Sequence, residues 1–285
     1  MGQSDGDRVQ QQQQDVQLQK DEHSQQHVVV MRHGDRLDNF EPLWASKASR
    51  PWDPPLTQDG KDRAFARGRK FRTDRNRFHF PIDRIFVSPF LRCLQTAAEV
   101  VHGLCAVNDD DPSVLSSADI TIDPSKIKVA VEYGLCEMLN TIAIRAEMVP
   151  KDYDFGFDIS KCEAILPAGT IDHSVEPIYT EVPQWGESTL DARNRYVSVI
   201  KALADKYPSE NLLLVTHGEA VGTSVSTYAE NTQVSAADYC GYSHLSRTFF
   251  PAEDQSFTAG AFQVHIKDGE NGLTYFGSSV ELDST

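Results

Sequence analysis

Four short and mostly apolar runs are spaced along this chain, and longer segments with helical periodicity lie between them. Runs of four or five residues with so few charges are typical of strands that are buried on both faces of a sheet. The predicted strands are residues 28–31, 84–87, 127–131 and 211–215.

Helices are expected between these strands. Thr57 is a candidate N-cap for a helix over 57–73, and Ser88-Pro89 ends one strand and opens a helix over about 90–102. A third, amphipathic helix is predicted over 187–207. Its apolar stripe is expected to hold Leu190, Val197, Ile200, Leu203 and Ala204.

This alternation of strands and helices predicts an α/β fold, a three-layer α/β/α arrangement around a mostly parallel central sheet. A further helix is expected after Gly218, and Thr248–Phe250 and Ala261–His265 are expected to add one or two late strands. Residues 39–55 and the acidic segment 108–124 are expected to be loops.

The sequence divides into a tail and one domain. Residues 1–25 are polar and rich in glutamine. They cannot bury enough apolar surface to offset the entropy cost of ordering, so we expect a disordered tail. Residues 26–285 are expected to form one domain, with a proline-containing insertion at about 140–185 that covers one face.

Chemically reactive side chains follow the predicted strands, where each strand ends. Three follow the first strand, and one lies in the helix after the second. One comes after the third strand and one after the fourth. Ligands bind at the carboxyl ends of the strands in such sheets, so we expect these side chains to converge. They are Arg32, His33, Arg36, Arg92, Glu137 and His217.

These residue types suit phosphoryl transfer. A neutral histidine such as His33 can attack phosphorus and form a covalent intermediate. Arginine matches phosphate oxygens with a planar fork that keeps its charge. A carboxylic acid can protonate the leaving oxygen and then deprotonate water, and both Glu132 and Glu137 are candidates. We expect Gly34 and Gly218 to let the backbone approach the phosphate.

Composition narrows the choice of partners. The net charge is −15 and the isoelectric point about 5.0, which disfavours nucleic acid and anionic membranes as partners. The sequence contains no apolar run of about 18 residues, so we expect no transmembrane helix, and no secretory signal is visible. The five cysteines have no paired spacing and fit a reducing compartment, so we expect a cytoplasmic or nuclear location. No spacing of His and Asp supports a metal site.

Taken together, these blocks resemble the histidine phosphatase superfamily, whose fold is phosphoglycerate mutase-like. Within this superfamily, the sequence is most similar to plant phosphoglycerate-mutase-family proteins and to the phosphatase domain of the ubiquitin-associated/SH3 phosphatases. The matching segments are residues 31–36, 88–97, 131–138 and 215–219, with accessory blocks at 53–57 and 186–195.

The resemblance implies a role for each site residue and no cofactor. His33 is the expected nucleophile, and His217 completes the pocket. The pattern Gly-Leu-Cys-Glu favours Glu137 over Glu132 as the proton donor. The expected phosphate-binding residues are Arg32, Arg36, Arg92 and His217.

Mutases of this family usually carry a serine and a tryptophan shortly after Arg-His-Gly, whereas Asp35, Arg36 and Leu37 stand here. The sequence therefore favours a phosphomonoester hydrolase acting through phospho-His33. Its expected substrate is a phosphorylated small molecule or a phosphopeptide. The alternatives are a phosphoglycerate-type mutase and a catalytically idle protein that binds phosphate or phosphopeptides. The sequence does not indicate the oligomeric state.

The rim that selects the substrate is expected to lie in residues 38–55 and 140–185. Aromatic side chains in this region either contact an apolar leaving group or pack under the loops. They are Trp44, Trp52, Tyr153, Phe155 and Trp185.

Overall fold

The computed structural model describes residues 25–73, 79–107, 114–251, 257–266 and 271–276. The strands are β1 (Gln25–Arg32), β2 (Arg84–Val87), β3 (Lys128–Val131), β4 (Leu212–Thr216), β5 (Gln233–Ala237), β6 (Tyr242–Pro251), β7 (Phe257–Ala259), β8 (Gln263–Val264) and β9 (Leu273–Phe276). The α-helices are α2 (Trp44–Lys47), α3 (Gln58–Thr73), α4 (Leu91–Cys105), α5 (Ile159–Glu163), α6 (Thr189–Lys206) and α7 (Gly218–Tyr228). Short 3-10 turns are η1 (Leu37–Asn39), η2 (Pro124–Lys126), η3 (Tyr133–Leu135) and η4 (Ala146–Met148).

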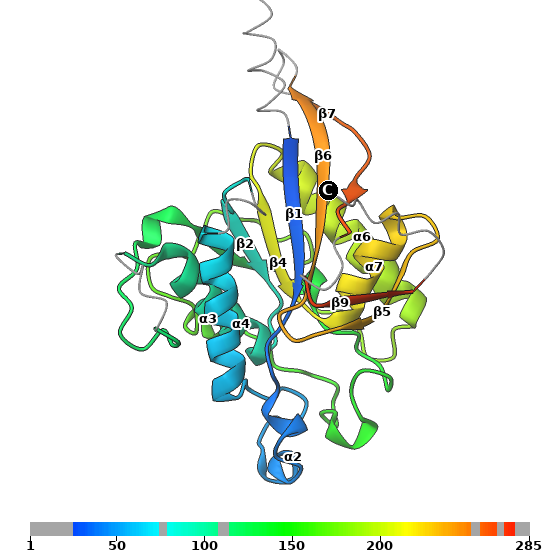
Figure 1. Cartoon of the computed structure of the whole chain (residues 1–285). Coiled ribbons are helices and arrows are strands. Elements are labelled where there is room, and N and C mark those ends of the chain that lie inside the picture. Colours follow the sequence, from blue (N-terminus) through cyan, green and yellow to red (C-terminus); the bar gives the residue numbers. More distant parts are fainter. Residues whose placement is uncertain (1–24, 74–78, 108–113, 252–256, 267–270, 277–285) are drawn as a thin grey trace, which may run out of the picture.

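The main sheet contains all four of the predicted apolar strands. Its order is β3-β2-β4-β1-β6-β7, with β8 also paired to β6. β3, β2, β4 and β1 run parallel to one another, whereas β6 is antiparallel to β1. Figure 1 shows these strands at the centre of the molecule. The predicted α/β fold with a mostly parallel central sheet is confirmed.

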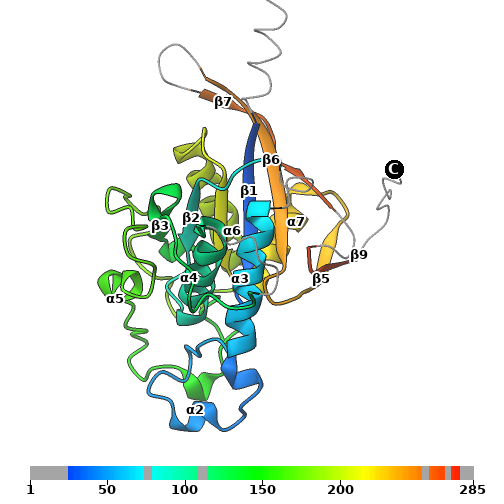
Figure 2. The same cartoon turned by 60° about the vertical axis from the view of Figure 1, so that its left-hand side comes forward.

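Helices cover both faces of this sheet. On one face α3 and α4 pack over a cluster that includes Val29 and Met31 of β1. On the other face α6 and α7 pack over a cluster that includes Val28 and Val30. Successive side chains of β1 thus point to opposite faces, as the pleat requires. The three-layer arrangement can be followed in Figures 1 and 2.

The helices α3 and α4 pack with their backbones in contact. A Cβ atom on Gly68 would lie 2.3 Å from the carbonyl oxygen of Val100, and one on Gly103 would lie 2.4 Å from that of Phe65. Only glycine fits at such distances. The close approach holds α4 against its neighbour, and α4 carries Arg92.

The helix boundaries agree with the sequence to within a few residues. Thr57 caps α3, since its Oγ1 accepts the backbone N–H of Gly60 at 2.9 Å. The predicted stripe of α6 was wrong at Leu190, which is 66% exposed. The buried stripe includes Ala192 and Tyr196, and Leu190 lies about 200° around the helix from Ala192.

Two regions contain more structure than the sequence predicted. Residues 39–55 include the helical turn α2, and the end of the chain holds β5, β7 and β9 besides the two expected late strands. These elements are short and have little apolar periodicity. Residues 140–185 also contribute Phe155, Cys162 and Leu166 to the core on the α4 face.

The predicted disordered tail lies outside the described residues, apart from Gln25, which begins β1. Residues 108–113 of the predicted acidic loop lie outside them too. The division into a tail and one domain with an insertion stays a prediction. Among the described helices, none is both long and apolar enough to span a bilayer.

Candidate active site

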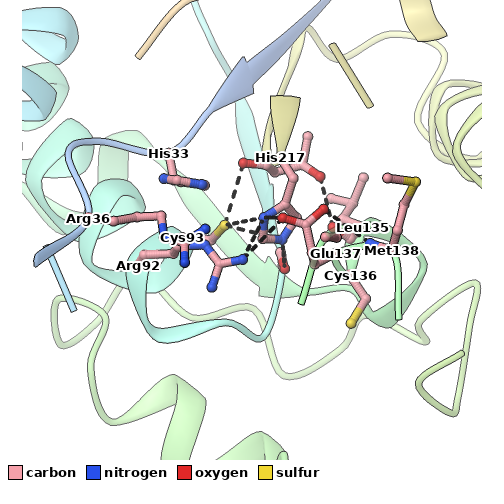
Figure 3. A network of polar contacts seen from close by, with 12 residues as sticks. His33, Arg36, Arg92, Cys93, Leu135, Cys136, Glu137, Met138 and His217 are labelled. Carbon is pink, nitrogen blue, oxygen red and sulfur yellow. Dashed lines mark hydrogen bonds and ion pairs between the residues drawn. The ribbon is translucent and has the colours of Figure 1, made fainter. Parts of the chain in front are cut away.

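The strands of the parallel sheet end at one level, where backbone hydrogen bonds join the segments that follow them. The N–H of His33 donates to the carbonyl of Thr216 at 3.0 Å, and that of Ser88 donates to Val215 at 3.0 Å. His33 and His217 therefore emerge side by side, with ring centroids 5.5 Å apart. Figure 3 shows the two rings with Arg36 and Arg92 close to them.

His33 is buried and held in one tautomer. Its Nδ1 lies 2.8 Å from the carbonyl oxygen of Gly34, which only accepts, so Nδ1 carries the proton and Nε2 keeps a free lone pair. Burial, together with the positive charges of Arg92 and Arg32, lowers the pKa of His33 well below its ordinary value. The ring is therefore a neutral imidazole near pH 7 and can act as a nucleophile.

The turn after His33 is fixed by its neighbours. The N–H of Gly34 donates to Thr96 Oγ1 of α4 at 2.9 Å. A Cβ atom on Gly34 would lie 2.7 Å from the carbonyl oxygen of Gly60, so glycine is required there by packing against α3. Gly218 has no such need, since a Cβ atom there would approach nothing closer than 3.7 Å.

Arg92, Glu137 and His217 form one buried cluster. Arg92 Nη2 lies 3.2 Å from Glu137 Oε2, and His217 Nδ1 lies 3.1 Å from the same oxygen. His217 Nε2 lies 2.9 Å from the hydroxyl of Ser88. With Ser88 donating to Nε2, the Nδ1 proton of a neutral His217 donates to Glu137.

The charges in this cluster follow from burial and pairing. Burial lowers the pKa of His217 to about 4, so this ring is neutral in the site as it stands. Burial alone would raise the pKa of Glu137, but His217 and Arg92 outweigh it and hold this pKa well below its usual range. Glu137 is therefore a carboxylate whose main countercharge is Arg92.

Arg92 has hydrogen-bond capacity to spare. Its side chain is 1% exposed, and its Nε and Nη1 have no hydrogen-bond partner among the described residues. A buried donor without a partner is costly, and a guanidinium charge more so. Each of these free donors, beside a nucleophilic imidazole, can donate a hydrogen bond to a phosphate oxygen.

Two further arginines flank His33, and each is held by another side chain. The guanidinium of Arg32 lies over the ring of Tyr239, 4.5 Å from its centroid. Arg36 donates through Nε to Asp38 Oδ1 at 3.0 Å and through Nη2 to Oδ2 at 2.7 Å. Such paired contacts fix the direction of the Arg36 fork.

The structure separates the two candidate acids. Glu137 lies in the cluster, whereas the carboxylate of Glu132 accepts the backbone N–H groups of Gly134, Ile178 and Tyr179 at 2.9, 2.7 and 3.0 Å. Glu132 therefore fastens residues 178–179 to the end of β3 and has no contact with either site histidine in the described structure.

Residues that the sequence left without a role support this site. Arg195 donates to the carbonyls of Gly134 and Cys136 at 2.7 and 3.0 Å and pairs with Glu187 at 2.7 Å. The accessory block at 186–195 thus holds the segment that carries Glu137. Tyr239 and Asp38 were not found from the sequence, because neither belongs to a reactive residue pattern.

No group of three or more His, Cys, Asp or Glu side chains in the described ranges is arranged to hold a metal ion. All five cysteines are free and buried. Burial raises the pKa of Cys93, which lies beside His217, to about 12, so this thiol stays protonated.

Two histidines at the strand ends of an α/β sheet, with arginines around them, form a site whose chemistry suits an anion with several oxygens. The sequence model of the histidine phosphatase superfamily (branch 1) matches residues 28–111 and 161–263, which is more than half of the chain. The chain therefore belongs to the histidine phosphatase superfamily. None of the curated proteins matches it.

Similar solved structures include phosphatases and a mutase. The ecdysone phosphate phosphatase of Bombix mori, in complex with tungstate, is 21% identical with a TM-score of 0.54, over 85% of this chain and 95% of that one. The phosphoglycerate mutase of Bacillus anthracis is 15% identical with a TM-score of 0.48, over 85% and 94%. A mycobacterial glucosyl-3-phosphoglycerate phosphatase is 16% identical with a TM-score of 0.46, over 85% and 98%. The first of these shows that the fold is shared.

The state of His33 can be tested by titration. We expect its ring to stay neutral, with the proton on Nδ1, as the pH falls from 8 to 6, because burial and the nearby arginines lower its pKa. Nitrogen-15 NMR of labelled histidine measures both properties, and His33→Ala assigns the signals. Arg92→Gln should move the titration of His33 to higher pH, whereas Arg193→Gln, in the exposed pair with Glu219, should not. A cationic His33 at pH 6.5 in the wild type would contradict this description.

Proposed function

We propose that this protein hydrolyses phosphate monoesters through a phosphohistidine at His33. The observation that carries the proposal is the pair of unpartnered Arg92 donors, buried beside an imidazole whose Nε2 is free. A dianionic phosphate would fill those donors and present phosphorus to Nε2. Arg32, Arg36 and His217 would add further positive or donating groups around it.

The first step forms a bond from Nε2 of His33 to phosphorus and breaks the bond from phosphorus to the leaving oxygen. Glu137 gives the leaving oxygen a proton, so that an alcohol departs. In the second step Glu137 takes a proton from water, whose oxygen attacks phosphorus. The bond to Nε2 breaks, which returns neutral His33 and releases inorganic phosphate.

Glu137 needs substrate to become an acid. In the described site it is a carboxylate paired with Arg92 and His217. An arriving phosphate dianion competes for Arg92 and places negative charge beside Glu137, and both effects raise the pKa of this carboxyl group. Substrate binding thereby favours the protonated form of Glu137, whose proton the first step consumes.

Hydrolysis is favoured over transfer to a second substrate by the residues after the nucleophile. Arg36 stands where family mutases usually have other residue types, and Asp38 directs its guanidinium. The superfamily's phosphatases act on phosphorylated compounds, and we propose a phosphorylated small molecule or phosphopeptide for this chain. We assign the activity to the cytoplasm or nucleus, because five free cysteines fit a reducing compartment.

The activity itself is tested with p-nitrophenyl phosphate between pH 5 and 8. The wild type should release nitrophenol and inorganic phosphate, and His33→Ala should lower kcat by about 10³-fold or more because it removes the nucleophile. No turnover at any of these pH values would favour the idle binding protein. Transfer of phosphate between phosphoglycerates, with little release, would favour the mutase.

The proton donor is tested by a matched pair of carboxylate variants. Glu137→Gln should lower kcat/KM for an alkyl phosphate by about 10²-fold or more, and much less for p-nitrophenyl phosphate, whose leaving group needs little protonation. Glu132→Gln should instead lower the melting temperature, since it weakens the buried contacts to three N–H groups. If Glu132→Gln lowered kcat/KM for the alkyl phosphate and Glu137→Gln lowered only the melting temperature, Glu132 would be the acid.

A further inference from the structure

The residues proposed to bind phosphate and their neighbours differ in exposure. His33, Arg92 and His217 are 1–2% exposed, and Glu137 is 9% exposed. Arg32, Arg36 and Tyr239 are the half-buried members of the surroundings. The part of a substrate beyond its phosphate is therefore expected to leave through an opening beside these three side chains.

Tyr239 is held firmly beside this opening. It lies in the turn Asp238–Gly241, in which the N–H of Gly241 donates to the carbonyl of Asp238 at 2.9 Å. Cys240 has a φ of 56°, a left-handed conformation that is uncommon for residues other than glycine. The N–H of Cys240 donates to the carbonyl of His33 at 3.2 Å, which ties the turn to the nucleophile.

The ring of Tyr239 connects the pocket to the segment after η1. Its centroid lies 6.0 Å from that of His33, and its hydroxyl accepts a hydrogen bond from the side chain of Asn39. Phe40 follows directly and is 61% exposed, and Leu43 is 71% exposed. These two exposed apolar residues lie in the short connection between η1 and α2.

The same segment carries a surface hollow of about 380 Å³, lined by Glu41, Pro42, Leu43, Trp44, Lys47 and Ala48. Its two charged residues have opposite signs. Two of the other aromatic side chains named for the rim pack under loops: Phe155 is buried, and Trp52 lies edge-on to it with centroids 6.1 Å apart. Tyr153 is 58% exposed and stacks on Trp185, with centroids 6.3 Å apart.

Charge around the opening disfavours an anionic group beyond the phosphate. Asp38 already neutralises part of Arg36, and Glu41 and Asp238 are exposed carboxylates next to the residues described above. A second phosphate or a carboxylate on the substrate would meet like charge there, whereas an uncharged apolar group would cover Phe40 and Leu43.

We propose that the leaving group of the substrate is an uncharged apolar alcohol that packs against Tyr239, Phe40 and Leu43. This rests on the proposed hydrolase function of the same site. The proposal assigns residues 39–44 to leaving-group binding and excludes phosphoglycerates as preferred substrates.

A series of n-alkyl phosphates from methyl to hexyl tests the proposal, because their leaving alcohols differ in apolar area but little in acidity. In the wild type kcat/KM should rise about twofold for each added methylene, because the group is only partly buried. Complete burial of a methylene would raise kcat/KM about fourfold. The hexyl ester should exceed the methyl ester by about tenfold or more. The double variant Phe40→Ser/Leu43→Ser should lower this hexyl-to-methyl ratio by about fivefold.

Phe250→Ser is the matched control. Phe250 is 55% exposed and lies in β6 near β7, at the opposite end of the molecule from α2 in Figures 1 and 2. This variant should leave the ratio unchanged. Turnover of all esters at equal kcat/KM, or faster turnover of 3-phosphoglycerate than of hexyl phosphate, would overturn the apolar subsite and leave the hydrolase intact. No turnover of any ester would overturn both.

Discussion

The proposed chemistry of this protein depends on one buried guanidinium with too few partners. Arg92 is 1% exposed, and Glu137 is the only carboxylate with which it pairs in the described structure. Moving a charge out of water is costly unless pairing and hydrogen bonds compensate. Two of its donor nitrogens lack a partner, so the empty site keeps part of this cost. An anion with several oxygens would relieve it, which is why we propose that the pocket binds phosphate.

The same charge sets the protonation states around it. It helps to lower the pKa of His33, which keeps the nucleophile neutral, and it helps to hold Glu137 as a carboxylate. Both states respond to the negative charge of a bound phosphate. The backbone contacts between strand ends and the close packing of α4 on α3 keep these groups within reach of one another.

Much of this arrangement could be predicted from the sequence, because strong local patterns place it. Buried parallel strands read as apolar runs, and the reactive residues at their ends are set by the chain order of the α/β fold. Family resemblance then separated Glu137 from Glu132. In the structure Glu132 binds backbone amides, and the role of Glu137 as proton donor stays a prediction.

The remaining features depend on contacts between distant segments, which periodicity does not report. Tyr239 reaches His33 only because β6 pairs with β1, and Leu190 is exposed because the sheet, not the helix, selects the buried stripe of α6. Gly34 serves packing against Gly60, where the sequence suggested approach to the phosphate. The strands β5, β7 and β9 are only three to five residues long, which is too short for a periodic pattern to be recognised.

A structure of the protein with orthovanadate tests the central claim most directly. The account predicts a five-coordinate vanadate with Nε2 of His33 as an axial ligand, and Nε or Nη1 of Arg92 within about 3 Å of one of its oxygens. Vanadate bound away from His33, or bound there with these two nitrogens of Arg92 still unpaired, would contradict it.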